Sequence, residues 1–217
     1  MAQKFVITIS REFGTGGRKI AEQLSEMLGV KIYDRKILTA LHSQFNLTEE
    51  EMNNIKAKKH NWWDDFSRYY QQAMAWANQQ YYETFAQNIT SKQLYEAEER
   101  ILREVAEQES CIILGRTGFY IFKDDPKAFK IFLIGDMPLR RESVAKRLNI
   151  TEGIADQLIK EVDEARENYT LTFSGKSRYD ARNYDLVLNV KDLPTESIAK
   201  FIAECVEKRM NEVSNFK

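Results

Sequence analysis

The chain has 217 residues, enough for one domain with a sizeable core and inserted segments. Its 32 lysines and arginines are balanced by 33 acidic residues, so there is no overall basic excess of the kind that indicates nucleic-acid binding. No apolar run approaches the length needed to cross a bilayer, and the residues before the first expected strand are too few for a signal peptide. We therefore expect a cytoplasmic protein with no membrane partner.

The chain opens with a strand, a glycine-rich turn and a helix. Residues 5–9 are an apolar, β-branched run, and from Ile20 onward the apolar positions recur with helical spacing. The turn between them carries Gly14, Thr15, Gly16 and Gly17. Glycine lets backbone N–H groups converge on an anion, and the helix that follows adds the positive end of its dipole. This stretch predicts a phosphate-binding loop, with a plain flexible turn as the alternative.

The loop departs from the usual G-x-x-x-x-G-K-[ST] pattern. If Gly16 is the second glycine of the pattern, Gly17 stands at the lysine position. A frame shifted by one residue puts Arg18 at the lysine and Lys19 at the magnesium-binding hydroxyl. We therefore expect a variant loop. A nicotinamide-binding G-x-G-x-x-G loop is disfavoured, because it would need a glycine where Lys19 stands.

A short strand over residues 30–34 follows and ends in Asp34. In open α/β sheets ligands bind beyond the carboxyl ends of the strands, so we expect Asp34 to face the same crevice as the loop. Equally, Asp34 could cap the helix that begins at Arg35.

Residues 37–108 contain neither glycine nor proline and are helical in character. Aromatic residues are dense between Trp62 and Phe85. We expect these rings to form a helix–helix core, and their spacing also suits a homodimer interface. A base-stacking platform is the alternative.

Two more buried-type strands are expected, over residues 110–114 and 130–134. The apolar run of the first opens with Cys111, which we expect to pack rather than react, and the strand leads to Arg116. An arginine at the carboxyl edge of a strand suits bidentate binding of a phosphate, with a surface salt bridge as the alternative. The second leads into a helix from Leu139 that carries the basic residues Arg140, Arg141, Lys146 and Arg147. This basic face could simply be solvated, or it could lie beside a triphosphate.

The segment from 151 to 183 divides in two. Its first part predicts a helix that ends near Arg166, with an apolar face formed by Ile154, Leu158, Val162 and Ala165. Residues 168–183 are a polar stretch that includes Lys176, Arg178 and Arg182. Such a basic stretch can close over phosphates, although an ordinary solvated loop is equally consistent with it.

A strand over residues 184–190 and a helix over residues 195–209 complete the chain. Strands and helices thus alternate through most of the sequence. This alternation predicts an α/β fold with a parallel sheet covered on both faces.

Taken together, these pieces resemble the nucleoside monophosphate kinases, and in particular the cytidylate kinase-like family. The matching stretches are residues 9–18 with Ala21, and residues 28–29, 33–34, 115–116, 131–147, 174–176 and 183–186. The resemblance implies a P-loop kinase-like three-layer fold with a core, a lid and an inserted helical monophosphate-binding region. The ranges implied are 1–36 and 109–217 for the core, about 150–183 for the lid within it, and 37–108 for the insertion.

The resemblance also implies an activity and a set of site residues. The activity is transfer of the γ-phosphoryl group of ATP, with magnesium, to a nucleoside monophosphate such as CMP or to a related small acceptor. The implied ATP-binding residues are Gly14, Thr15, Gly16, Gly17, Arg18 and Lys19, and the implied acceptor-binding residues are Asp34 and Arg116. The candidates for neutralising charge on the transferred group are Arg18, Arg147, Arg166 and Arg178.

Two further departures from the family pattern concern the acceptor. Thr117 stands where an acidic residue usually follows the arginine, and Thr39-Ala40 replace an expected tyrosine–arginine pair. These changes leave the nucleobase open. A non-catalytic nucleotide-binding protein that kept the kinase fold is the alternative function.

Overall fold

The computed structural model of the chain describes residues 4–34 and 92–215. The chain divides into two compact units, one made of Met1–Ile32 with Glu104–Lys217 and the other of Tyr33–Arg103. The first unit holds the glycine-rich loop. The aromatic segment between Trp62 and Phe85, with the homodimer interface expected there, lies outside the described residues.

A parallel sheet forms the centre of the fold. Its strands are β1 Val6–Arg11, β2 Lys31–Asp34, β3 Cys111–Leu114, β4 Ala128–Ile134 and β5 Leu186–Asn189. They lie in the order β2-β3-β1-β4-β5, and β1 pairs in parallel with both β3 and β4, as β4 does with β5. The register sets Arg11 opposite Leu133, so β1 and β4 end together at the edge where the loop begins. The predicted α/β fold with a parallel central sheet is confirmed.

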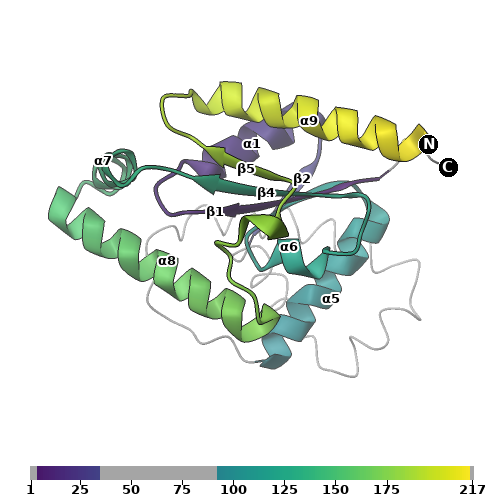
Figure 1. Ribbon diagram of the computed structural model, residues 1–217, viewed down its shortest axis with the longest axis horizontal. Helices are drawn as coiled ribbons and strands as arrows, with labels where there is room; N and C mark the ends of the chain where they lie inside the picture. The colour runs from purple at the N-terminus through teal and green to yellow at the C-terminus, as the bar shows by residue number, and fades with distance from the viewer. Residues whose placement is uncertain (1–3, 35–91, 216–217) are drawn as a thin grey trace. The chain divides into compact units, whose positions relative to one another are not determined.

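Helices cover both faces of the sheet. The described helices are α1 Gly17–Leu28, α5 Lys92–Gln108, α6 Gly118–Ile121, α7 Met137–Leu148, α8 Glu152–Ser174 and α9 Thr195–Asn215, with a 3₁₀ turn, η1, at Ala181–Asn183. Figure 1 shows α1 and α9 on one side of the sheet and α6 and α8 on the other. Helix α5 crosses the boundary between the two units. The first unit is therefore built in three layers.

The layer of α1 and α9 buries the main core. Ile20 and Leu24 lie four residues apart on α1, and both are fully buried against the sheet together with Ile202 of α9. This spacing places the two α1 side chains on the same face of the helix. Gly29 ends α1 in the left-handed conformation, as the Leu28-Gly29 pair predicts.

Helices α7 and α8 pack against each other around a second apolar cluster. It contains Phe13 of the loop, Val144 of α7, and Ala155, Ile159 and Val162 of α8. The prediction that Ile154 belongs to the apolar face is wrong, because its side chain is 55% exposed. The true buried stripe is rotated by one residue, since Ala155 and Ile159 face the cluster.

Helix α8 is also longer than predicted. It was expected to end near Arg166 but continues to Ser174, where Gly175 adopts a left-handed conformation and its N–H donates to the Leu171 carbonyl at 2.9 Å. The polar side chains of this last part form their hydrogen bonds within the helix. The hydroxyls of Thr170, Thr172 and Ser174 each donate to the carbonyl four residues earlier. Residues 168–174 are therefore helical, and the interpretation of them as a polar loop is wrong.

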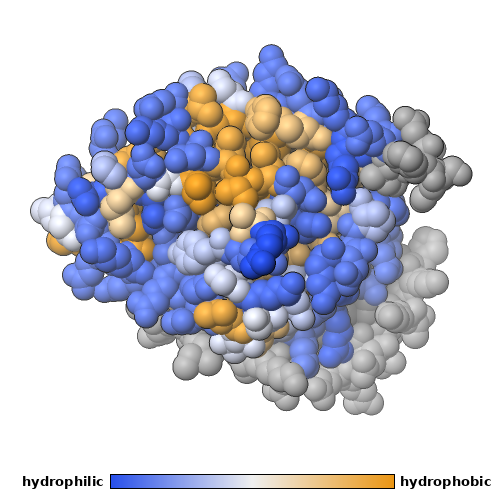
Figure 2. Space-filling model, viewed as in Figure 1, coloured by the Kyte–Doolittle hydropathy of each residue, from blue (hydrophilic) through white to orange (hydrophobic). Residues whose placement is uncertain are grey.

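One face of the first unit carries exposed apolar side chains. Figure 2 shows them gathered over the region of β5 and α9. Val187, Leu193 and Phe201 are 38%, 49% and 46% exposed. None of the helices in residues 4–34 and 92–215 combines the length and apolar character that a membrane crossing requires.

Cys111 begins β3 and is fully buried, in agreement with the expectation that it packs. Burial, with a smaller contribution from Glu109, raises the pKa of its thiol to about 12. The reactive thiolate is therefore scarce at neutral pH.

Candidate functional site

The glycine-rich loop joins β1 to α1 at the carboxyl edge of the sheet. Gly14 and Gly16 have φ angles of 95° and 70°, which lie in the left-handed region that glycine adopts most easily. Gly16 is also the N-cap of α1, and no side chain caps this helix end. The first turn of α1 contains no acidic residue. These features leave the positive end of α1 suited to an anionic ligand.

Gly14 also has a packing requirement. A Cβ atom placed on it would lie 2.7 Å from the backbone oxygen of Arg140, a distance that forces the backbone to move. We expect Gly14→Ala to lower the free energy of unfolding by about 1–3 kcal/mol, measured by urea denaturation. Gly153→Ala is the matched control, because a Cβ there meets nothing within 4 Å and alanine favours the helix. Equal stability of the two variants would contradict the loop geometry.

Three arginines from outside the loop converge on its first residues. Arg166 Nη1 of α8 donates to the carbonyl oxygen of Arg11 at 3.0 Å, and the Arg178 guanidinium donates to the same oxygen. Arg140 of α7 donates through Nε to the carbonyl of Phe13 at 2.8 Å. The entry to the loop is thus surrounded by guanidinium groups that come from three separate parts of the chain.

Asp163 lies at the centre of this arginine cluster. Its Oδ1 accepts a hydrogen bond from the Phe13 N–H at 2.9 Å, and its Oδ2 pairs with Arg140. The same carboxylate lies 3.5 Å from Arg166 Nη1 and 3.6 Å from Arg178 Nη1. Asp163 and Arg140 are both only 6% exposed. One buried carboxylate therefore connects three arginines to the loop backbone.

The other carboxylate of the cluster belongs to Glu12. Its Oε2 accepts from the Gly135 N–H at 2.9 Å and lies 3.3 Å from Arg140 Nη1. The Thr15 hydroxyl donates to the Glu12 carbonyl at 2.9 Å, which tightens the turn. Glu12 therefore ties the loop to the junction between β4 and α7.

Among the described residues of this region, positive charges outnumber negative ones. The members of the cluster with formal charge are Arg11, Arg140, Arg166, Arg178, Glu12 and Asp163. The pKa of Arg166 is lowered well below its ordinary value, first by burial and then by the charges of Arg11 and Arg178. A bound anion would relieve this crowding of like charges.

The structure brings Arg147 to the same region. Its guanidinium carbon lies 5.0 Å from the centroid of the Phe13 ring, and that of Arg166 lies 5.5 Å from it. Arg18, in contrast, forms an ion pair with Glu22 along α1 at 3.0 Å. Lys19 is exposed on the first turn of α1. Arg147, Arg166 and Arg178 are thus grouped near the start of the loop, and the catalytic roles of all four arginines stay predictions.

The two residues assigned to the acceptor lie in different units. Arg116 follows β3 and has a left-handed backbone conformation. Its neighbours Gly115 and Thr117 also have positive φ angles. Its guanidinium carbon lies 4.5 Å from the centroid of the Tyr169 ring of α8. Asp34 is the buried last residue of β2 and belongs to the second unit. Their role in acceptor binding stays a prediction.

The end of β3 borders the arginine cluster. A Cβ on Gly115 would lie 2.5 Å from Arg11 Nη1, so the chain just before Arg116 touches the Arg11 side chain. Successive non-glycine residues with positive φ are strained and are often found at functional sites. This strain could not be read from the sequence.

The sequence assigned no site role to Glu12, Asp163 or Arg140. Arg140 was expected only as part of a basic helix face, either solvated or beside a triphosphate. The solvated alternative is wrong for Arg140, because it is buried and paired with Asp163. Asp163 itself was not singled out. A signal was present, since Asp163 follows Val162 and lies four residues after Ile159, so it extends the buried stripe of α8.

Comparison with known proteins gives a family and a fold. A model of the cytidylate kinase-like family matches residues 6–192. A crystal structure of a protein from Eubacterium ventriosum ATCC 27560, described as uncharacterized, is 20% identical with a TM-score of 0.69 over 95% of this chain and 99% of that chain. A gluconokinase from Sinorhizobium meliloti 1021 is 11% identical with a TM-score of 0.51 over 99% of each chain. No curated protein matches.

Proposed function

Because the chain belongs to the cytidylate kinase-like family, we propose that it transfers the γ-phosphoryl group of ATP to a nucleoside monophosphate or a related small acceptor. The observation that carries the proposal is the meeting of Arg166 and Arg178 at the Arg11 carbonyl, where the glycine-rich loop begins. Phosphoryl transfer depends mainly on positioning and charge neutralisation, and in this proposal the arrangement would supply both.

In this proposal the glycine-rich loop and the arginine cluster have different roles. The backbone N–H groups of Gly14, Gly16 and Gly17, with the uncapped end of α1, would hold the ATP phosphates. The cluster arginines Arg166 and Arg178 would supply the positive charge that a loop lysine usually provides.

Magnesium would arrive with ATP, because it is held mainly by phosphate oxygens and water molecules. The described residues contain no group of three or more acidic, histidine or cysteine side chains able to hold a metal ion by itself. The Glu12 carboxylate is engaged by Gly135 and Arg140. When bound, magnesium would neutralise charge on the nucleotide phosphates.

For the acceptor, we expect Arg116→Ala to lower kcat/KM for the phosphate-bearing acceptor by about 100-fold or more. The reason is loss of the cation proposed to hold the acceptor phosphate. The measurement is ADP formation with ATP, magnesium and a panel containing CMP, the other nucleoside monophosphates and gluconate. Arg209→Ala, exposed on α9, is the control and should turn over normally. Unchanged turnover in Arg116→Ala would remove Arg116 from the acceptor site.

A non-catalytic nucleotide-binding protein is the second candidate. The lysine position of a kinase loop holds Gly17 or, in the frame shifted by one residue, Arg18, which is paired with Glu22. In that shifted frame Lys19 stands at the position of the hydroxyl. Magnesium-dependent ADP formation with any acceptor of the panel would favour the enzyme. ATP binding with no product from the whole panel would favour the regulator.

A further inference from the structure

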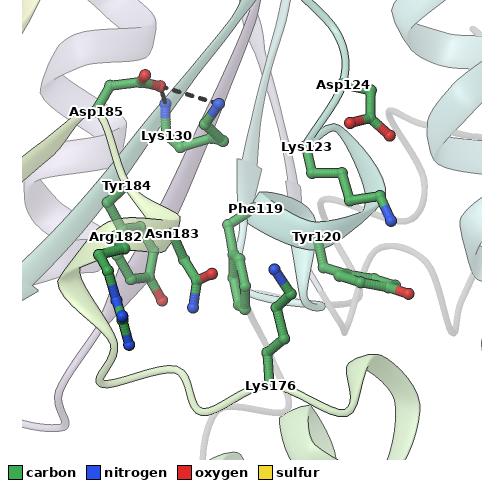
Figure 3. Close-up of a pocket in the computed structure, with 10 residues that line it drawn as sticks. All are labelled: Phe119, Tyr120, Lys123, Asp124, Lys130, Lys176, Arg182, Asn183, Tyr184 and Asp185. Carbon is green, nitrogen blue, oxygen red and sulfur yellow. Dashed lines mark hydrogen bonds and ion pairs between the residues drawn. The ribbon is translucent and has the colours of Figure 1, made fainter.

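A cavity of about 290 Å³ lies on the α6 side of the sheet. Figure 3 shows its walls, which come from α6 and the turn that follows it, from β4 and from the segment between α8 and β5. Its aromatic residues are Phe119, Tyr120 and Tyr184, and its basic residues are Lys123, Lys130, Lys176 and Arg182. None of the glycine-rich loop residues is among the side chains that line it.

The cavity and the loop are separated along the strands. Lys130 pairs with Thr8 of β1, three residues before the Arg11–Leu133 pair at which the loop begins. Three residues of a parallel strand span roughly 10 Å. The cavity is therefore displaced toward the amino end of β4, away from the edge that carries the loop.

Two of the four cations in the cavity are already neutralised. Lys130 Nζ lies 3.4 Å from Asp185 Oδ2, and the Lys130 N–H donates to the same oxygen at 2.8 Å. Arg182 makes two hydrogen bonds to the Asp180 carboxylate, at 2.8 Å and 2.9 Å.

The ammonium groups of Lys123 and Lys176 differ from these. Within residues 4–34 and 92–215, neither has a carboxylate at ion-pairing distance. Two carboxylates also line the cavity, those of Asp124 and Asp185, and Asp185 is the partner of Lys130. Lys123 and Lys176 are thus the two lining cations with no carboxylate partner among the described residues, which suits a doubly charged anion.

The aromatic residues that line the cavity indicate which kind of ligand would carry that anionic group. Lys123 Nζ lies 4.5 Å from the centroid of the Tyr120 ring, and Figure 3 shows the Lys176 side chain reaching up between Phe119 and Tyr120. A half-exposed tyrosine ring beside lysines can stack on a planar base. The volume lies just below the usual range of roughly 300–1,000 Å³ for ligand sites, which excludes a dinucleotide. We propose that the cavity is a second ligand site that binds a mononucleotide, with its phosphate on Lys123 and Lys176.

The cavity shares a structural segment with the arginine cluster. Tyr184 forms part of the wall, packs against Phe119 and Phe132 with centroids 5.1 Å apart in each case, and donates its hydroxyl to the Arg178 carbonyl at 2.7 Å. Lys176 and Arg178 are two residues apart. A mononucleotide in the cavity would therefore contact the segment that places Arg178 beside the loop.

Photolabelling of the full-length protein with 8-azidoadenosine 5′-monophosphate tests the site without needing turnover. Saturating non-hydrolysable ATP analogue occupies the glycine-rich loop, and peptide mass spectrometry maps the label. We expect label on the peptides containing residues 119–124 or 176–185. Lys123→Ala with Lys176→Ala should reduce it about ten-fold or more, because two charged contacts are lost. Lys200→Ala with Lys208→Ala, both exposed on α9, is the matched double control.

Competition identifies the ligand. Unlabelled AMP should remove the label at concentrations at which ribose 5-phosphate and inorganic phosphate do not. Equal competition by ribose 5-phosphate would overturn the assignment to a mononucleotide. Label elsewhere only, or label unaffected by the double substitution, would overturn the site. None of these outcomes depends on whether the protein is a kinase.

Discussion

Asp163→Asn is expected to lower the free energy of unfolding by about 3 kcal/mol or more. The substitution keeps the shape of the side chain and its acceptor for the Phe13 N–H, but it removes the negative charge that pairs with Arg140. Arg140 is 6% exposed, and loss of one partner of a buried ion pair leaves the other charge uncompensated. Arg166 and Arg178 also lie within 3.6 Å of this carboxylate, so the substitution would remove the negative charge that offsets their mutual repulsion.

Urea denaturation followed by circular dichroism measures this loss. Asp156→Asn is the matched control, because Asp156 pairs with Arg141 and Lys160 on the surface of the same helix, where ion pairs contribute little. Adding Arg140→Met to Asp163→Asn should recover a large part of the lost stability, since the unpaired buried charge is then gone. If Asp163→Asn is no less stable than Asp156→Asn, Asp163 does not organise the cluster.

The strands and helices that make up the first unit were largely predictable, because their signals are local. The apolar run before Gly14 and the helical spacing from Ile20 define β1 and α1, and Cys111 opens β3 as expected. The four-residue helix α6 was not predicted, because it is too short to show a helical period. The end of α8 was misplaced, because its hydroxyls bond within the helix, and sequence polarity alone suggests a loop there.

The candidate site was predictable only in part. The glycines between the first strand and helix predicted the loop, and the resemblance to a kinase family implied roles for Arg166 and Arg178. Which carboxylate would join them depends on contacts between residues far apart in the sequence, such as Phe13 with Asp163. The burial of Arg140 also depends on contacts between distant residues. Arg141 and Lys146 on the same helix are more exposed, and no local sequence signal distinguishes Arg140 from them.

Arg166→Met is expected to reduce kcat of the proposed phosphoryl transfer by about 100-fold or more, while the Kd for ATP changes less than ten-fold. An arginine that neutralises charge on the transferred group acts mainly in the transition state, so its loss appears in kcat. Steady-state kinetics with the best acceptor of the panel and ATP-binding titrations give the two quantities. Arg141→Met on the surface of α7 should leave both unchanged.

A purely structural role for Arg166 predicts a different result, and stability separates the two. The lowered pKa of Arg166 means that the folded protein disfavours its charged form relative to the unfolded chain, in which arginine is fully charged at neutral pH. Its positive charge therefore works against folding, so Arg166→Met should leave the free energy of unfolding unchanged or raise it while turnover falls. A loss of activity that merely parallels a loss of stability would show that Arg166 supports the fold and does not act on the phosphoryl group.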